Sequence, residues 1–332
     1  MIGQENREVE RKVIAILRVL SDSPEPLGGR IIARRLGDFG IELGERAVRY
    51  HLKLMDERGL TRSVGRRDGR SITQRGVEEL KSALVNDRVG SIAARIELLS
   101  YQTSLDLEKG AGEVPIDTCL FPKEEFIPAL DAMKDAFSAG LCVSDLVAVA
   151  FEGERLGEVI VPRGKAGLAT VSSIVVNGVL LKAGIPLDSK FGGILQIRNH
   201  KPLRFIELIE YSGCSLDPAE IFVASKMTSV GEAAARGEGK ILANLGETPA
   251  PCRPMVETII EKLKEAGLGV PVMIGETSEP VCEVPVRLNK IGMILQSGLN
   301  PAAAAVEAGI VVVNRALSGV MDFGELRSFW DL

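Results

Sequence analysis

A short amphipathic segment near the N-terminus, residues 44–60, constrains the fold of this chain more than any other feature. The apolar residues on one face follow helical spacing and are Val48, Leu52 and Met55. Another face carries three cations and a tyrosine at i, i+3, i+4 and i+7, namely Arg46, Arg49, Tyr50 and Lys53. The segment predicts a helix that packs one side on a core and presents a cationic side to a partner.

The flanking residues place this helix in a specific order of elements. Helices are predicted over Glu8–Leu20 and Gly29–Leu36, a strand over Leu60–Arg66, a two-residue hairpin turn at Asp68-Gly69, a return strand over Arg70–Thr73 and a helix over Gln74–Leu84. This is the order of a winged helix-turn-helix, which reads DNA with its third helix.

Three wing arginines extend the predicted DNA-binding surface. We expect the helix residues to reach base edges and the wing to contact the phosphate backbone or the minor groove. The expected DNA-binding residues are Arg46, Arg49, Tyr50, Lys53, Arg66, Arg67 and Arg70. A winged helix that contacts RNA or another protein is the alternative interpretation.

Charge is distributed unevenly along the 332 residues, whose net charge is −5. Residues 1–85 hold 17 Lys and Arg against 13 Asp and Glu, whereas the remainder holds 23 against 32. Only the N-terminal part is therefore expected to meet a polyanion. Because the N-terminus is polar and no apolar run approaches membrane-spanning length, we expect a cytoplasmic protein without a membrane partner.

The inventory of reactive residues argues against catalysis. The five cysteines are widely spaced and there are two histidines, one of which, His51, lies in the predicted DNA-reading helix. No nucleophile–base pair or metal-ligand cluster stands out, so we expect no disulfide framework, no metal, no cofactor and no enzyme. Two carboxylate pairs, Asp217 with Glu220 and Glu207 with Glu210, fit loop capping and a strand surface more simply than catalysis.

Beyond residue 84 the pattern changes. A two-heptad seam predicts a connector helix over 85–100, with apolar residues Val85, Val89, Ile92, Ile96 and Leu99. From residue 101 to 332 strand and helix patterns mix, which predicts an α/β (α+β) domain. Helices are expected over Glu124–Ala139, Pro254–Ala266 and Pro301–Ala308, and strands over Thr103–Leu107, Gly112–Leu120, Leu146–Phe151, Gly157–Val161, Gly193–Ile197, Arg204–Glu210, Glu220–Ala224, Val270–Ile274, Val284–Leu288 and Gly292–Leu295.

A weak internal repeat predicts two related lobes. Residues 176–186 resemble residues 288–301 with gaps, and each copy follows a helix that ends in Ala-Gly-Leu, at Leu141 and Leu268. The predicted organisation is thus a winged helix over 1–84, a connector helix over 85–100 and an α/β domain of two lobes over 101–332.

Two sets of residues resemble a known family. Glu45–Thr61 is similar to the winged-helix domain at the start of the NrpR nitrogen-regulation repressors, a domain also described in ribonuclease R-like proteins. The strings that resemble the effector-binding domain of that family are Val175–Pro186, Phe191–Gly193, Arg204-Phe205, Ile209–Phe222, Met227–Val230, Gly298–Ala304 and Glu307–Gly309. One such domain is present here, whereas some family members carry two in tandem.

The resemblance implies a homodimeric repressor of nitrogen-assimilation genes, typically archaeal, that binds a palindromic DNA operator. In the family the effector is the dicarboxylate 2-oxoglutarate, which weakens operator binding. Whether this chain acts alone or with a second NrpR-type protein stays open. So do two alternatives: a regulator that responds to another metabolite, such as an amino acid or a different dicarboxylate, and a winged-helix protein-interaction module.

A 2-oxoglutarate site must pair two carboxylates, so it needs cations, backbone N–H groups or a helix N-terminus. The Gly-rich loop at 162–170 is the first candidate, followed by a cationic strand region and a helix start at Asn300. The expected effector-binding residues are Arg163, Lys165, Thr170, Ser172, Asn177, Arg204 and Asn300.

Overall fold

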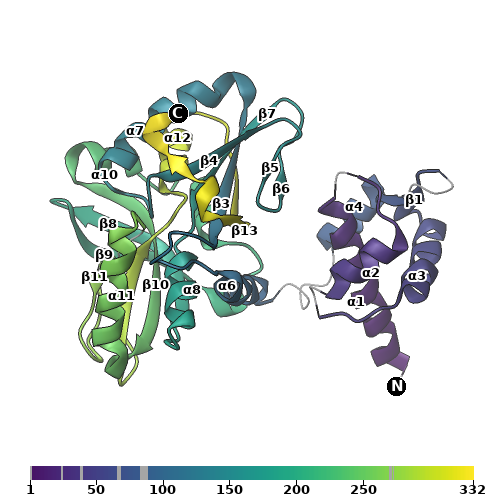
Figure 1. Cartoon of the computed structure of the whole chain (residues 1–332), viewed down its shortest axis with the longest axis horizontal. Helices are drawn as coiled ribbons and strands as arrows, with labels where there is room; N and C mark the ends of the chain where they lie inside the picture. The colour runs from purple at the N-terminus through teal and green to yellow at the C-terminus, as the bar shows by residue number, and fades with distance from the viewer. Residues whose placement is uncertain are drawn as a thin grey trace. The chain divides into compact units, whose positions relative to one another are not determined.

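The chain divides into two compact units, Met1–Val89 and Gly90–Leu332, which we call the N-terminal and C-terminal units. The computed structural model describes residues 2–23, 25–37, 40–65, 69–82, 89–268, 271 and 273–332. Figure 1 shows the helices of the N-terminal unit and the sheets of the C-terminal unit. Each unit has its own hydrophobic core.

The N-terminal unit has the winged-helix order that the sequence predicts. Its elements are α1 (Ile2–Ser21), α2 (Gly29–Gly37), α3 (Glu45–Glu57), β1 (Thr61–Ser63), β2 (Arg70–Ile72) and α4 (Gln74–Ser82). Ile16, Ile32 and Leu52 are buried together between the helices. The three-helix core therefore fixes the orientation of α3, as its apolar spacing requires.

The hairpin differs in detail from the prediction. Strands β1 and β2 pair antiparallel from Thr61↔Ile72 to Ser63↔Arg70, and the Val64 N–H donates to the Gly69 carbonyl at 3.1 Å. The expected strand Leu60–Arg66 is thus shorter, and the connection is longer than a two-residue turn at Asp68-Gly69. Asp68 itself lies outside the described residues.

The C-terminal unit contains two five-stranded sheets. The first has the order β13-β3-β7-β4-β14 and the second the order β11-β12-β10-β8-β9, and every pairing within them is antiparallel. The strands are β3 (Glu113–Pro122), β4 (Leu146–Phe151), β7 (Lys165–Val171), β8 (Asp188–Arg198), β9 (Lys201–Glu210), β10 (Gly239–Pro249), β11 (Met273–Ile274), β12 (Lys290–Gln296), β13 (Val313–Asp322) and β14 (Arg327–Ser328); the short strands β5 (Arg155–Leu156) and β6 (Val159–Ile160) form a separate hairpin.

Helices pack on these sheets. They are α6 (Ser91–Gln102), α7 (Phe126–Ser138), α8 (Ile174–Lys182), α9 (Pro218–Ala224), α10 (Val230–Arg236), α11 (Arg253–Glu265) and α12 (Asn300–Glu307). The largest core cluster joins α7 and α12 to both sheets, and a second cluster joins α8 and α11 to β3 and β12. Apolar helix faces thus bury the sheet faces and hold the two sheets together.

The unit is an internal duplication whose copies exchange their last strands. The first copy runs β3–α7–β4–β7–α8–β8 and the second runs β10–α11–β11–β12–α12–β13. However, β8 pairs with β10 of the second copy, and β13 pairs with β3 of the first. The two predicted lobes are therefore present, and each sheet is completed by a strand of the other copy.

The pairing registers fix which residues correspond. Ile116 pairs with Val171 and Gly319, just as Ala243 pairs with Gln296 and Gly193. The next residues along β3 and β10, Asp117 and Asn244, are therefore equivalent. The repeat that the sequence suggested between 176–186 and 288–301 is out of register, because α8 corresponds to α12 rather than to β12.

Several predicted elements of the C-terminal unit were wrong. The expected connector helix over 85–100 is instead α6, which starts at Ser91 and belongs to the C-terminal unit; Val85 lies outside the described residues. The segments Thr103–Leu107 and Val284–Leu288 form no strand beyond isolated bridges, and Glu220–Ala224 is part of helix α9. Strand β10 and helix α10 were not predicted.

Candidate functional sites

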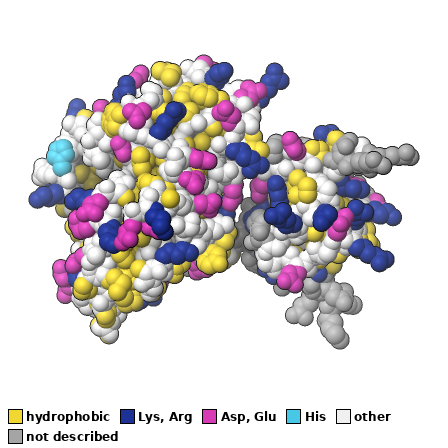
Figure 2. Space-filling model, in the orientation of Figure 1, with side chains coloured by type: hydrophobic (Ala, Val, Ile, Leu, Met, Phe, Trp, Pro, Cys, Tyr) yellow, Lys and Arg dark blue, Asp and Glu magenta, His cyan; other side chains and the backbone are white. Residues whose placement is uncertain are grey.

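Helix α3 exposes all four residues of its predicted binding face. Arg46, Arg49, Tyr50 and Lys53 are exposed, whereas Val48, Leu52 and Met55 on the opposite side are at most 1% exposed. Arg49 forms an i,i+4 ion pair with Glu45 at 2.5 Å, which orients the guanidinium along the helix. Figure 2 shows Lys and Arg side chains over the visible surface of this unit. The face can donate hydrogen bonds to an anionic groove.

His51, on the same helix, faces the core and has no role on this surface. It is buried, and burial together with nearby Lys12 lowers its pKa, so the ring is neutral at physiological pH. A buried neutral imidazole packs like an aromatic residue, and Tyr50 contacts its edge.

The wing is fixed to the end of α3 by one carboxylate. Asp56 accepts a hydrogen bond from the Thr61 hydroxyl at 2.6 Å and from Arg70 Nε at 2.7 Å. Leu27 exchanges two backbone hydrogen bonds with Arg70, so β2 is held on both sides. Arg70 was expected as a free cation of the wing tip, but its guanidinium is engaged by Asp56. Arg66 and Arg67 lie outside the described residues.

The two copies of the C-terminal unit meet at a buried polar seam, formed by Asp117, Ser172, Ser173, Asn244 and Ser297. Asn244 Nδ2 donates to Ser173 Oγ at 2.7 Å, and the Tyr211 hydroxyl donates to Asn244 Oδ1 at 2.7 Å. The Asp117 carboxylate accepts the Leu317 N–H at 2.8 Å. The seam thus links β3, β10 and β13 with the loop that precedes α8.

Three carboxyl groups at the seam have raised pKa values. Burial raises the pKa of Asp117 and of Glu220 to about 7, and that of Asp217 to about 6. Backbone N–H donors oppose the shift: Asp217 caps α9 through the Ala219 N–H, and Glu220 accepts the Ala316 N–H. Asp217 thus caps a helix, and Glu220 binds the backbone of β13.

The seam also holds a strained turn of β13. Leu317 has φ of 52°, in the left-handed region that is unfavourable for a branched side chain. Its N–H is bound by Asp117, and its carbonyl accepts a hydrogen bond from Arg95 of α6 at 3.0 Å. The first helix of the C-terminal unit is therefore bonded directly to the strand that the two copies exchange.

The structure scatters the expected effector-binding residues. Thr170 and Ser172 are buried at the seam, where the Thr170 hydroxyl donates to the Gly298 carbonyl of the other copy. Arg163 is 95% exposed on the turn before β7, 3.9 Å from Glu152, and Lys165 begins that strand. Arg204 is exposed on β9, where it bonds Gln196. These residues do not converge on one pocket.

Asn300 has a structural role that the sequence did not predict. It follows the N-cap residue Leu299 instead of capping α12, and it is fully buried. Its side-chain amide accepts from the Leu242 N–H and donates to the Leu242 carbonyl, at 2.8 and 3.0 Å. The amide makes the hydrogen bonds to Leu242 of β10 that a neighbouring strand would otherwise make, so it is not available to a ligand.

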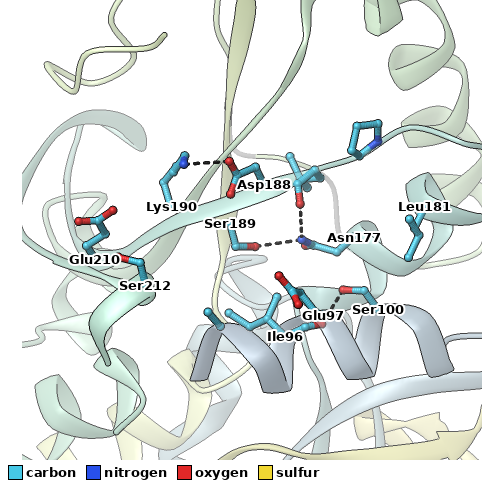
Figure 3. A pocket seen from close by; sticks show the side chains of 13 residues that line it. Ile96, Glu97, Ser100, Asn177, Leu181, Asp188, Ser189, Lys190, Glu210 and Ser212 are labelled. Atoms are coloured by element: carbon cyan, nitrogen blue, oxygen red, sulfur yellow. Dashed lines mark hydrogen bonds and ion pairs between the residues drawn. The ribbon is translucent and has the colours of Figure 1, made fainter. Parts of the chain in front are cut away.

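Asn177, by contrast, lines a cavity of about 430 Å³ between α6, α8 and the start of β8 (Figure 3). Lys190, Glu97 and Glu210 line the same cavity. The sequence analysis paired Glu210 with Glu207 and did not connect it with Glu97, because the two glutamates come from elements far apart in sequence. The cavity is therefore a candidate for a small-molecule site.

Asp117 was also missed, although a signal existed. It is the one buried carboxylate in the strand Glu113–Pro122, whose other carboxylate, Glu113, is exposed at its start. A charged residue in such a strand requires dedicated partners.

Neither a cluster of metal-ligating side chains nor a membrane-spanning helix is found among the described residues. They contain no group of three or more His, Cys, Asp or Glu side chains arranged to hold a metal ion. None of the helices in this part of the chain has the length and apolar character needed to cross a bilayer.

Comparisons with known proteins identify related sequences for both units. Residues 89–328 match the family model described as NrpR regulatory domains NRD1 and 2, and residues 14–80 match that of the ribonuclease R winged-helix domain. The global nitrogen regulator NrpRI of Methanosarcina mazei is 40% identical over 320 residues, which cover 96% of this chain and 98% of that protein.

Longer relatives and one solved structure are also similar. The global nitrogen regulator NrpR of Methanocaldococcus jannaschii is 34% identical over 322 residues, 96% of this chain and 55% of that protein. The NrpR of Methanococcus maripaludis is 31% identical, with 54% of its length covered. The chain thus spans about half of these two proteins. A crystal structure of a nitrogen repressor-like protein from Methanococcus jannaschii covers 73% of this chain and 98% of its own, with a TM-score of 0.60 and 26% identity.

Proposed function

The chain belongs to the NrpR family of nitrogen regulators, and on that premise we propose that it is a DNA-binding transcriptional repressor of nitrogen-assimilation genes, released from its operator by 2-oxoglutarate. The observation that carries the DNA-binding part is the exposed face of α3, opposite a fully buried apolar back. A helix held in this way by a winged-helix core can enter the major groove with its cationic side chains facing the DNA.

We further propose that the protein acts as a homodimer on a palindromic operator. A single recognition helix covers a few base pairs, so two copies on two half-sites would supply the affinity that one lacks. The effector can release DNA only by its difference in affinity between two dimer geometries, one with the recognition helices at half-site spacing and one without.

The DNA-reading face is tested with the variant Arg49→Ala. A DNA site is first selected from a random pool by the protein itself, and binding is then measured by fluorescence anisotropy. We expect affinity for the selected site to fall by roughly 1–3 kcal/mol, the value of one good bidentate base contact, and affinity for random DNA to fall less.

The matched control is Arg155→Ala, which removes an exposed arginine from the C-terminal unit. It should bind both DNAs as the parent does. Equal losses on both DNAs for Arg49→Ala would contradict the placement of the recognition face. Binding that does not weaken as salt rises would instead favour a protein-interaction module, since phosphate contacts release counterions.

The effector is tested in the same assay with 2-oxoglutarate. We expect saturating 2-oxoglutarate to lower affinity for the selected site, whereas succinate at equal concentration does so less. Arg163 and Lys165 lie close together at the turn into β7, so Arg163→Gln and Lys165→Gln are the first variants to compare. Unchanged DNA affinity at saturation would remove 2-oxoglutarate from the mechanism and leave the DNA-binding proposal standing.

A further inference from the structure

The cavity beside α6 has a lining that determines the kind of molecule it can accept. Its volume of about 430 Å³ lies in the range of small-molecule sites. Helix α6 contributes Ile96 and Glu97, α8 contributes Asn177, and the start of β8 contributes Asp188 and Lys190, as Figure 3 shows. Three elements that are distant in sequence thus enclose one space.

The cavity is preformed by tight packing between its helical walls. A Cβ on Gly178 of α8 would lie 2.3 Å from the side chain of Thr103, just after α6, so no larger residue fits at this contact. The chain is therefore closely packed where these two walls of the cavity meet.

The charges of the lining are mostly negative. Its ionisable groups are three carboxylates and one ammonium, from Glu97, Asp188, Glu210 and Lys190. The ammonium is already engaged, because Lys190 Nζ lies 2.8 Å from Asp188 Oδ2, and the Arg287 guanidinium binds the same oxygen at 2.7 Å. Glu97 and Glu210 form no ion pair with any other part of the chain that the structure describes.

The uncharged polar groups add acceptors more than donors. The Ser100 hydroxyl donates to the Ile96 carbonyl, and Asn177 Nδ2 donates to Ser189 Oγ and to the Leu187 carbonyl. The remaining amide oxygen, Asn177 Oδ1, is buried without a hydrogen-bond partner. A ligand that enters would therefore meet the negative charge of Glu97 and Glu210, beside the hydroxyl groups of Ser189 and Ser212.

Apolar residues complete the lining and favour a ligand with an aliphatic carbon chain. They are Ala93, Ile96, Leu181, Pro186 and Leu187. The two unpaired carboxylates would repel a dianion of similar size, whereas an ammonium would form an ion pair with them.

We propose that this cavity is a binding site for a small aliphatic molecule with a primary ammonium group, which Glu97 and Glu210 recognise. This proposal rests on the lining of the cavity and depends neither on DNA binding nor on a response to 2-oxoglutarate. Because α6 is the first helix of the C-terminal unit and is bonded through Arg95 to the exchanged strand β13, a bound ligand contacts an element that joins the two copies.

The experiment is isothermal titration calorimetry on the full chain with three four- or five-carbon probes. They are 1,4-diaminobutane as a dication, L-norvaline as a zwitterion and succinate as a dianion. We expect saturable binding of an ammonium probe and none of succinate. Tighter binding of diaminobutane would identify a cationic ligand, and tighter binding of norvaline a zwitterion whose carboxylate uses Lys190; either outcome supports the site.

Variants of the cavity and of a distant surface test whether the ammonium probe binds in this cavity. The double change Glu97→Gln and Glu210→Gln should weaken the ammonium probe about tenfold or more, in line with the loss of charge-assisted hydrogen bonds. Glu232→Gln on α10 removes an exposed carboxylate elsewhere and should change nothing. Both glutamates are exposed, so folding should persist, which thermal melting checks.

The proposal is overturned if neither ammonium probe shows saturable binding, if succinate binds in their place, or if the double variant binds as the parent does. Failure of 2-oxoglutarate to release DNA would leave these results untouched, because they are read as direct heats of binding. The two proposals therefore fail separately.

Discussion

Asp117 and Asn244 occupy the same position in the two copies, yet one is an acid and the other an amide. Both lie at the seam, and each accepts a hydrogen bond there, Asp117 from the Leu317 N–H and Asn244 from the Tyr211 hydroxyl. An amide oxygen serves this purpose without a charge. The acid instead carries a desolvation cost that raises its pKa to about 7.

The variant Asp117→Asn should therefore stabilise the protein at high pH. A carboxyl whose folded pKa is raised contributes stability that is fully present below its unfolded pKa, near 4, and is lost as pH rises through about 7. We expect the gain in stability to be larger at pH 8 than at pH 5 by on the order of 2 kcal/mol, since each pKa unit between pH 5 and about 7 corresponds to about 1.4 kcal/mol and neighbouring acids share the protons.

Thermal denaturation of the full chain at the two pH values measures this difference. The control is Asp135→Asn, an exposed carboxylate on α7, which should leave the pH dependence unchanged. A loss of stability of equal size at both pH values would show that the charge of Asp117 is required by its hydrogen bonds.

At the scale of elements, the wing depends on its attachment to α3. Asp56 bonds both strands of the hairpin, through Thr61 on β1 and Arg70 on β2, and these residues are only partly exposed. Two-stranded hairpins are marginally stable alone, so this carboxylate decides where the wing lies relative to the recognition helix.

We expect Asp56→Ala to destabilise the N-terminal unit by about 1–2 kcal/mol, because it removes two hydrogen bonds to a charge that solvent partly screens. Urea denaturation followed by circular dichroism would measure the loss. Glu57→Ala, its exposed neighbour on the same helix, provides the comparison and should have an effect below about 0.5 kcal/mol. Equal losses for the two variants would show that the hydrogen bonds of Asp56 to the wing contribute nothing measurable to stability.

Helix α9 shows why some elements were mispredicted. The apolar run Glu220–Ala224 was interpreted as a strand, but Asp217 caps a helix there and Pro218 takes its first position. That Asp-Pro start is a recognisable helix signal, so the error was avoidable. Strand β10 gave no such signal, because Gly246 and polar residues interrupt its alternation.

The candidate sites also differ in whether a local sequence pattern could predict them. The face of α3 could be predicted because one helix carries all its residues at fixed spacing. The seam and the cavity could not, because strand exchange brings together β3 and β13, about two hundred residues apart, and no local pattern records that pairing. For the same reason Asn300 could be mistaken for a ligand residue.

At the scale of the whole molecule, strand exchange makes the C-terminal unit one folding unit despite its two copies. Removing either copy would leave the other sheet without β8 or β13. The N-terminal unit has a separate core, with its contacts within Met1–Val89.

Differential scanning calorimetry of the full chain should therefore resolve two transitions, one for each unit. The larger enthalpy should belong to the C-terminal unit, because enthalpy scales with residue number. Asp56→Ala should shift only the smaller transition, and Asp117→Asn at pH 8 only the larger. A third transition, or a shift of both by one variant, would contradict this assignment.

Exchange of the last strands also bears on ancestry. A half-length polypeptide of this design would complete its sheet only by trading strands with a twin, so its natural state would be a pair of identical chains. In such a pair every mutation changes both identical chains at once. Fusion into one gene ends that constraint, and the acid in one copy opposite the amide in the other is the kind of divergence that only a fused descendant can keep.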